Sequence, residues 1–101
     1  MTKITIQEQD KVMTAELEGR LDTIASAQAE ADMKPLFDYE GDEIILDCSS
    51  LIYISSSGLR IFLKLLKQTK AKGIKLYIKG MNDNLRNVFT MTGFFHLFEF
   101  K

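Results

Sequence analysis

The sequence predicts an α/β fold with a mostly parallel sheet, an antiparallel hairpin at the N-terminus and about three helices. Two runs of alternating apolar and polar residues open the chain, and a continuous apolar run follows at 44–46. Segments with helical spacing of apolar residues then alternate with short strand-like runs. Strand–helix alternation of this kind brings parallel strands together through crossover helices. The expected element order is therefore β-β-α-β-α-β-α-β within a single domain spanning residues 1–101.

The hairpin is predicted from two short runs with the period of a half-buried strand. Their apolar members are Ile4 and Ile6 in the first run, and Met13, Ala15 and Leu17 in the second. The polar stretch 8–11 separates the runs, and two such runs across a short break are typical of a β-hairpin. We expect Gly19 to end the second strand.

The first helix is expected from Ile24 to about Phe37, with Asp22 or Thr23 as its N-cap. Its alanine content favours a helix. Pro35 lacks an N–H and clashes with the preceding turn, which predicts a break near Lys34. The predicted apolar face, which would lie on the sheet, consists of Ile24, Ala27, Ala31, Met33, Leu36 and Phe37.

The apolar run Ile44–Leu46 has the pattern of a strand covered on both faces, and residues 47–50 are expected to close it. Cys48 is interpreted as a small core residue, because no His or Lys adjoins it in the sequence to activate a thiol. As the only cysteine, it excludes a disulfide framework.

The strongest helical pattern follows three consecutive serines at 55–57. Its apolar stripe is Leu59, Phe62, Leu63 and Leu66, widened by Ile61 and Leu65; the cations Arg60, Lys64, Lys67 and Lys70 lie toward the other side. Lys72 and Gly73 predict its C-terminal cap. The remaining elements are a strand at 75–79, a helix capped by Asn82 or Asp83 that stops at Gly93, and a final strand formed by Leu97, Phe98 and Phe100.

Charge is distributed unevenly along the chain. Residues 1–47 hold twelve acidic and four basic residues, whereas residues 48–101 hold two acidic and nine basic residues. Two interpretations stay open: solvated faces of opposite sign, or a charged docking surface for a partner. The acidic first part and the apolar placement of most aromatic residues argue against direct nucleic-acid binding.

Motifs for catalysis, cofactors and metals are missing from the sequence. The serines lie outside a Gly-x-Ser-x-Gly elbow, there is no phosphate-binding or dinucleotide-binding glycine pattern, and His96 is the only histidine. We expect no enzyme activity, no cofactor and no metal. The apolar runs are too short to cross a membrane and no signal segment opens the chain, which indicates a cytoplasmic protein. We expect the domain to fold alone as a monomer, because the sequence has a single apolar core pattern and no ligand clusters.

The three serines are therefore the candidate functional residues of the sequence. Ser is a preferred helix N-cap, because its hydroxyl oxygen accepts a hydrogen bond from a free N–H of the first turn. The N-terminus of a helix also carries partial positive charge and tolerates an anion. A serine at this position is either a simple cap or a suitable place for a phosphate.

Four stretches resemble the signature segments of STAS domains, and in particular of stand-alone bacterial anti-sigma factor antagonists. These stretches are Gly19–Thr23, Asp47–Leu51, Tyr53–Arg60 and Met91–Phe94. The resemblance covers nearly the whole chain, from about Ile4 to Phe100, and the serine-Gly-Leu segment is its most specific part. It implies a STAS-like domain.

The resemblance also implies which residues act. In the family the phosphoacceptor lies two residues before the glycine of the serine segment, which is Ser56 here; Ser57 and Ser55 are the alternatives. The family commonly has Asp just before the acceptor, where this chain has Ser55. The partner-binding residues implied are Asp22, Thr23, Ser55, Ser56, Ser57, Gly58 and Arg60.

The function implied is that of a phosphorylation-controlled binding module. The unphosphorylated protein would sequester an anti-sigma factor that is also a serine kinase, and so free a sigma factor for transcription. A serine phosphatase would reset the phosphorylated form. The alternative is a non-switching STAS subunit of a transporter or signalling complex, in which the serines only cap the helix.

Overall fold

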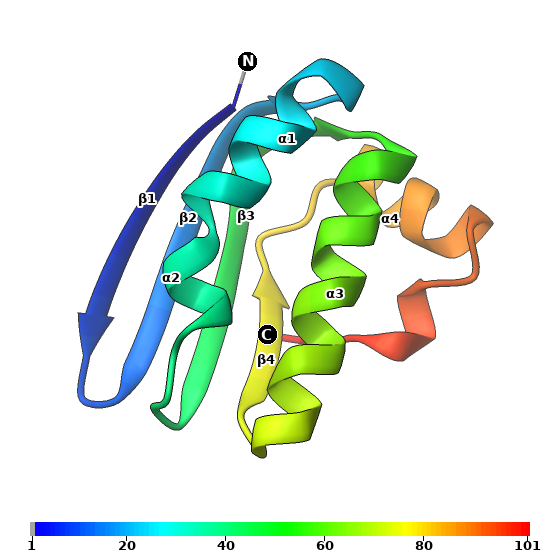
Figure 1. Ribbon diagram of the computed structural model, residues 1–101. Coiled ribbons are helices and arrows are strands. Elements are labelled where there is room, and N and C mark those ends of the chain that lie inside the picture. Colours follow the sequence, from blue (N-terminus) through cyan, green and yellow to red (C-terminus); the bar gives the residue numbers. More distant parts are fainter. Residues whose placement is uncertain (1) are drawn as a thin grey trace.

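The computed structural model describes residues 2–101. Figure 1 shows the elements in chain order: β1 (Thr2–Gln9), β2 (Val12–Leu21), α1 (Thr23–Asp32), α2 (Lys34–Phe37), β3 (Glu43–Ile54), α3 (Ser56–Lys72), β4 (Lys75–Lys79), α4 (Asp83–Met91), the 3-10 turn η1 (Phe95–Leu97) and β5 (Glu99–Phe100).

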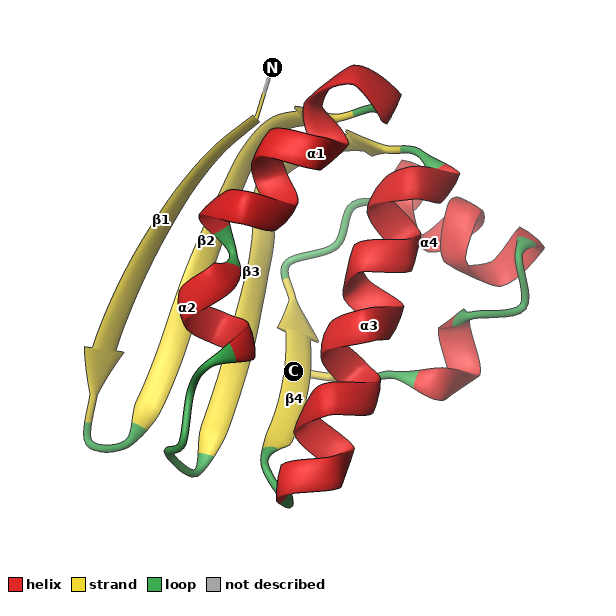
Figure 2. Cartoon of the chain, viewed as in Figure 1, coloured by secondary structure: helices red, strands yellow, loops and turns green. Residues whose placement is uncertain are grey.

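The strands form one mixed sheet in the order β1-β2-β3-β4-β5. Strands β1 and β2 pair antiparallel, and every other neighbouring pair is parallel. Helices α1, α2 and α3 lie together on one face of this sheet (Figure 2). The predicted α/β fold, with its mostly parallel sheet and N-terminal hairpin, is confirmed.

The hairpin turn consists of Asp10 and Lys11, whose φ angles are 54° and 65°. Positive φ at both central residues is the geometry of a two-residue turn that matches the twist of the flanking strands. The prediction that Gly19 ends the second strand is wrong. β2 continues to Leu21, and Gly19 lies at a register irregularity with a φ of 90°, where a residue without Cβ avoids strain.

The predicted helix break is confirmed. α1 ends at Asp32, Met33 separates the two helices, and α2 carries Pro35 in its first turn, where its missing N–H costs no hydrogen bond. The predicted apolar face is wrong along α1, where Ile24, Ala27 and Ala31 are all exposed, and it holds only beyond this helix, at Met33, Leu36 and Phe37. Ile24 is 92% exposed, whereas Ser26 and Ala29 are buried. Small side chains bring α1 close to its neighbours, and the Ser26 hydroxyl donates to the Asp22 carbonyl at 2.7 Å.

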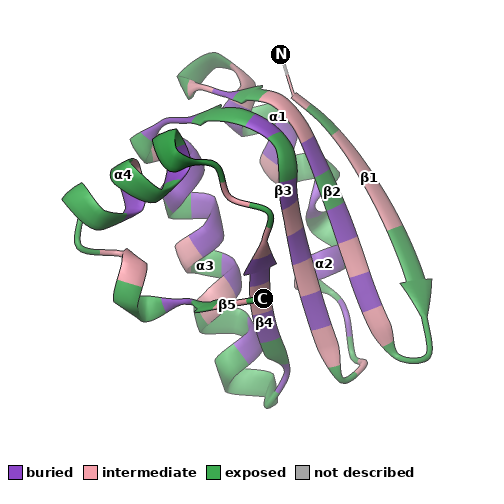
Figure 3. Ribbon diagram, turned by 180° about the vertical axis from the view of Figure 1, so that it is seen from behind, coloured by how far each residue is buried: buried purple, intermediate pink, exposed green. Residues whose placement is uncertain are grey.

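Strand β3 is longer than predicted. In its first half, the helices cover only one of its two faces. Residues 47–50 do not close it, because it continues to Ile54 with two register shifts against β2. Ile44, Leu46 and Cys48 are buried under the helices, while Ile45 on the opposite face is half-buried. Figure 3 shows this alternation along β2 and β3 on the face without α1 and α2. Coverage of the 44–46 run on both faces was therefore a wrong prediction.

The core centres on α3. Leu59, Phe62 and Leu65 are buried, whereas Leu63 and Leu66 are half-buried, so the contact face is rotated from the predicted stripe toward Ile61 and Leu65. The predicted cationic side is exposed, and Gly73 caps the helix with a φ of 74°.

The C-terminal segment completes the core with aromatic rings. Phe89 of α4 lies 6.2 Å from Phe62 and 5.6 Å from Phe98, measured between ring centroids. Asn82 is the N-cap of α4, as predicted, and accepts a hydrogen bond from the Leu85 N–H at 2.9 Å. The last strand is shorter than expected, because residues 95–97 form η1 and only Glu99 and Phe100 pair with β4.

Candidate functional site

The three serines have different structural roles. Ser55 is the N-cap of α3: its Oγ accepts a hydrogen bond from the Gly58 N–H at 3.2 Å, and the residue is 7% exposed. Ser56 is the first residue of the helix and is exposed, while Ser57 is half-buried. Because Ser55 caps the helix, the exposed residue Ser56 is not needed as the cap.

Two helix N-termini meet at the carboxyl ends of β2 and β3. The Ser55 N–H donates to the Leu21 carbonyl at 2.8 Å, which ties the start of α3 to the end of β2. One residue further on, Asp22 caps α1, and its Oδ1 accepts from the Ala25 N–H at 2.9 Å. The parallel pairing of β2 with β3 thus brings the predicted residues Asp22 and Thr23 next to the serines.

Gly58 lets the first turn of α3 approach the sheet. A Cβ at this position would lie 2.8 Å from Leu21 Cγ and 2.9 Å from Ile54 Cγ1, closer than real side-chain contacts allow. Both Gly58 and Ser55 are buried, so these two of the predicted contact residues are not available at the surface. The predicted residues available at the surface are Thr23, Ser56 and Arg60, which are exposed, and Asp22 and Ser57, which are half-buried.

Arg60 lies one helical turn after Ser56 and is exposed. Within residues 2–101, no ion pair engages its guanidinium. The next cation along this face, Lys64, is held by Glu30 of α1 at 3.1 Å. Arg60 is thus the cation nearest in sequence to the exposed serine, and its charge is uncompensated.

Exposed apolar side chains near the serines were missed by the sequence reasoning. Ile24 is 92% exposed in the first turn of α1, and Ile52 and Tyr53, at 56% and 38% exposed, shortly precede the serines. The guanidinium carbon of Arg20 lies 4.5 Å from the centre of the Tyr53 ring. No signal in the sequence marks Ile24 as exposed, because its apolar side chain fits the predicted helix face.

Other reactive groups of the chain do not assemble a site. Burial raises the pKa of the Cys48 thiol to about 12, so it stays protonated, in line with the predicted core role. Within residues 2–101, His, Cys, Asp and Glu side chains form no cluster suited to a metal ion. No helix among those residues has the length and apolar character needed to cross a membrane.

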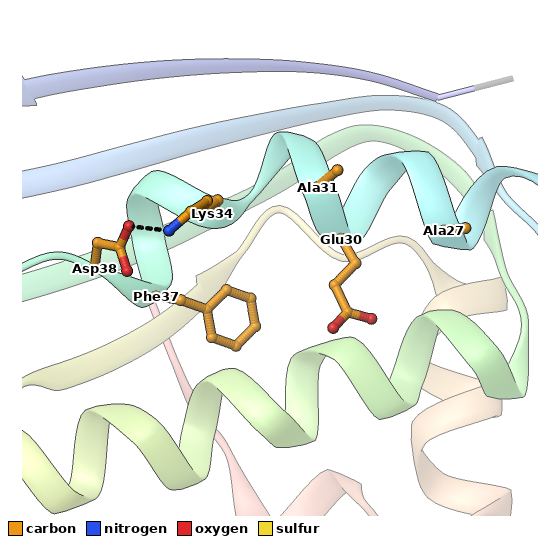
Figure 4. A pocket seen from close by; sticks show the side chains of 6 residues that line it. All are labelled: Ala27, Glu30, Ala31, Lys34, Phe37 and Asp38. Carbon is orange, nitrogen blue, oxygen red and sulfur yellow. Dashed lines mark hydrogen bonds and ion pairs between the residues drawn. The ribbon is translucent and has the colours of Figure 1, made fainter.

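A groove of about 480 Å³ runs along α1 and α2. Figure 4 shows its lining residues, with Glu30 and Phe37 directed toward α3 and Lys34 bonded to Asp38. The Lys34–Asp38 pair, at 2.7 Å, is well exposed, and Glu30 is paired with Lys64. The polar groups of this groove are therefore already satisfied within the chain, and none points to a ligand.

The family model described as STAS domain matches residues 3–101. The chain belongs to the STAS domain family, which confirms the resemblance drawn from the four sequence stretches.

BtrV of Bordetella bronchiseptica, whose name assigns it to the anti-sigma factor antagonists, is 31% identical over 95% of this chain and 83% of its own length. A crystal structure of an anti-sigma factor antagonist from Mycobacterium paratuberculosis superposes with a TM-score of 0.88 at 15% identity, covering 99% of this chain and 85% of that one. The phosphorylated form of SpoIIAA from Bacillus gives a TM-score of 0.73 at 20% identity, covering 98% and 91%. These two likenesses show the fold.

Proposed function

We propose that this protein is an anti-sigma factor antagonist, a binding regulator that is itself not an enzyme. Unphosphorylated, it binds an anti-sigma factor with serine kinase activity and thereby frees a sigma factor. The observation that carries the proposal is that Ser55 and Ser56 have different structural roles. Ser55 is the buried helix cap, and Ser56 is exposed at the first helical position. The anti-sigma factor antagonist name of its relative BtrV supports the same assignment.

The switching reaction transfers one phosphoryl group. The Oγ of Ser56 attacks the γ-phosphorus of ATP in the kinase, the new Oγ–P bond forms, and the bond to the β,γ-bridging oxygen breaks. ADP leaves, and the serine proton passes to a base of the kinase or to solvent. A phosphatase later hydrolyses the phosphoserine to serine and inorganic phosphate.

The proposed partner surface combines polar and apolar groups from α1, α3 and the end of β3. Thr23 and the exposed Ile24 open α1, Ser56 opens α3, and Arg60 supplies a cation. A phosphate on Ser56 adds about −1.5 to −2 charges at neutral pH. Desolvating that charge in a tight interface opposes binding by a few kcal/mol, or about a hundredfold or more.

The serine that replaces the family's usual Asp at position 55 is compatible with this switch. Position 55 is the N-cap, a role for which Ser and Asp are about equally suited. A neutral cap also places no negative charge beside the acceptor, so a phosphate on Ser56 meets less repulsion here than next to a carboxylate.

The test is phosphorylation of the wild type and of the Ser55→Ala, Ser56→Ala and Ser57→Ala variants by the cognate kinase and ATP, with site mapping by mass spectrometry. Ser56→Ala should lose the label and keep partner binding. Ser57→Ala should be labelled like the wild type, and Ser55→Ala should still be labelled but lose about 0.5–2 kcal/mol of stability with its cap.

Full labelling of Ser56→Ala would show that the acceptor is misassigned. Partner binding without labelling of any form would favour the non-switching subunit of a transporter or signalling complex.

A further inference from the structure

We propose that Arg60 is the internal ligand of the phosphate on Ser56 and keeps that phosphate dianionic below neutral pH. This inference rests on the proposed function, because it concerns the phosphorylated form. Arg60 would then help to set the charge of the phosphoserine, independently of any group that the partner contributes.

The spacing of the two residues brings their side chains together. Ser56 and Arg60 are four residues apart on α3 and both exposed, so they share one face of the helix. Residues at this spacing have Cβ atoms about 5–6 Å apart. Because side chains in a helix lean toward its N-terminus, the long Arg60 side chain extends over the turn that carries Ser56.

The guanidinium of Arg60 is also free to bind a phosphate on Ser56. Within residues 2–101 it takes part in no ion pair, whereas Lys64, one turn further, is held by Glu30. The first turn of α3 contains no acidic residue that would compete for the guanidinium. The surrounding charges are the Asp22 carboxylate at the start of α1 and Arg20, which stacks on Tyr53.

The chemistry of the pair favours the dianion. A guanidinium presents a planar fork of N–H donors that matches two phosphate oxygens, and such charge-assisted hydrogen bonds are stronger than neutral ones. Pairing with a cation stabilises the more highly charged form of an acid, so the second pKa of the phosphoserine, ordinarily about 6, is lowered. The negative charge of Asp22 acts to raise the second pKa of the phosphate. Asp22 is present in every variant compared, so its effect cancels in the comparison.

The test uses protein with phosphoserine inserted at position 56 during translation, so that no kinase is needed. A phosphorus NMR titration at about 0.1 M salt, where the Debye length is about 10 Å, measures the second pKa in the Arg60 protein and in Arg60→Gln. We expect the pKa to be about 0.3–0.7 units higher in Arg60→Gln, with Arg60→Lys in between. The Nε–H resonance of Arg60 should also shift on phosphorylation.

Lys67→Gln is the matched control, because it removes one exposed positive charge from the same helix three turns away from Ser56. It should change the phosphate pKa by less than about 0.2 units, as expected for a screened distant charge. Equal pKa values in the Arg60 protein and Arg60→Gln would overturn the proposal, and so would equal shifts in Arg60→Gln and Lys67→Gln.

The outcome is independent of the kinase assay above. A missing pKa difference with intact Ser56 labelling refutes only the role of Arg60. Absent labelling together with the expected pKa difference refutes the switch and leaves the Arg60–phosphate contact established.

Discussion

At the scale of single residues, the site depends on a serine and a glycine that are not at the surface. Ser55 satisfies the first turn of α3, and Gly58 allows that turn to pack on Leu21 and Ile54. Together they hold Ser56 at an exposed position that needs no other support. Two of the four residues in the serine-serine-serine-glycine motif are therefore explained by capping and packing, and Ser56 is free for the proposed acceptor role.

Gly58→Ala should destabilise the protein by about 1–3 kcal/mol, because the new methyl group would overlap Leu21 and Ile54. This outcome is opposite to the intrinsic preference of a helix for Ala over Gly, which is about 1 kcal/mol. Urea denaturation measures the change. The cost should shrink when Leu21 is also replaced by Ala, and an unchanged cost in that background would contradict the packing explanation.

At the scale of elements, burial on α3 separates side chains that look equivalent in the sequence. Leu65 is fully buried, Leu63 is half-buried, and Lys67 is exposed. Leu65→Ala should therefore cost about 2–5 kcal/mol, the usual range for a buried Leu. Leu63→Ala should cost clearly less, and Lys67→Ala less than about 0.5 kcal/mol. Thermal and urea unfolding would test this order, and a larger loss at Leu63 than at Leu65 would mean that the helix is rotated differently.

The irregular middle of β3 is held by Asp47, whose Oδ1 accepts from the N–H and the hydroxyl of Ser49 at 3.0 and 2.6 Å. Partial burial by itself raises the pKa of Asp47, but the hydrogen bonds from Ser49 and the charge of Lys79 outweigh it and hold the pKa below its usual range.

A depressed folded-state pKa gives stability that is present at neutral pH and lost as the pH falls through that pKa. Ser49→Ala should therefore lower stability at pH 7 and flatten its decline between about pH 5 and pH 3. Urea unfolding across this range measures both effects. A steeper acid decline in Ser49→Ala than in the wild type would contradict the assigned cause.

At the scale of the whole molecule, the fold brings the acidic and basic parts of the chain together. Among residues 2–101, four of the five ion pairs join an acid from the first 47 residues to a lysine from the remainder: Lys64–Glu30, Lys72–Glu40, Lys79–Asp47 and Lys101–Glu43. The charge asymmetry of the sequence is therefore partly neutralised within the molecule. Each of these pairs has at least one exposed partner and contributes little to stability, and none of them involves Arg60.

The proposed partner surface exists only in the assembled molecule, because it draws on α1, α3 and β3. Ile24→Ala should change stability by less than about 0.5 kcal/mol, because the side chain is 92% exposed, yet weaken partner binding at least about tenfold if it is buried in the complex. Met91→Ala, at a side chain 86% exposed on α4, is the matched control and should leave binding unchanged. Calorimetric titration with the anti-sigma factor measures the affinity of both variants. Equal affinities for Ile24→Ala and the wild type would show that Ile24 is not part of the partner surface.

The sequence by itself determined the order and type of the elements, because these depend on local chemistry. Asp22 and Asn82 cap helices through their own side chains, Pro35 interrupts one through its missing N–H, and Gly73 ends one in a left-handed conformation. The position of the serine segment at the entry of a helix was readable for the same reason.

Only the tertiary structure decided which serine caps, which is exposed, and which helix faces are buried. The rotation of a helix about its axis depends on the surface it packs on, so α1 buries Ser26 and Ala29 and turns Ile24 outward, against the apolar pattern. The extension of β3 to Ile54 likewise places Ser55, and not its neighbours, at the cap. Local propensities are nearly equal among these alternatives, and contacts between residues distant in the chain select one of them.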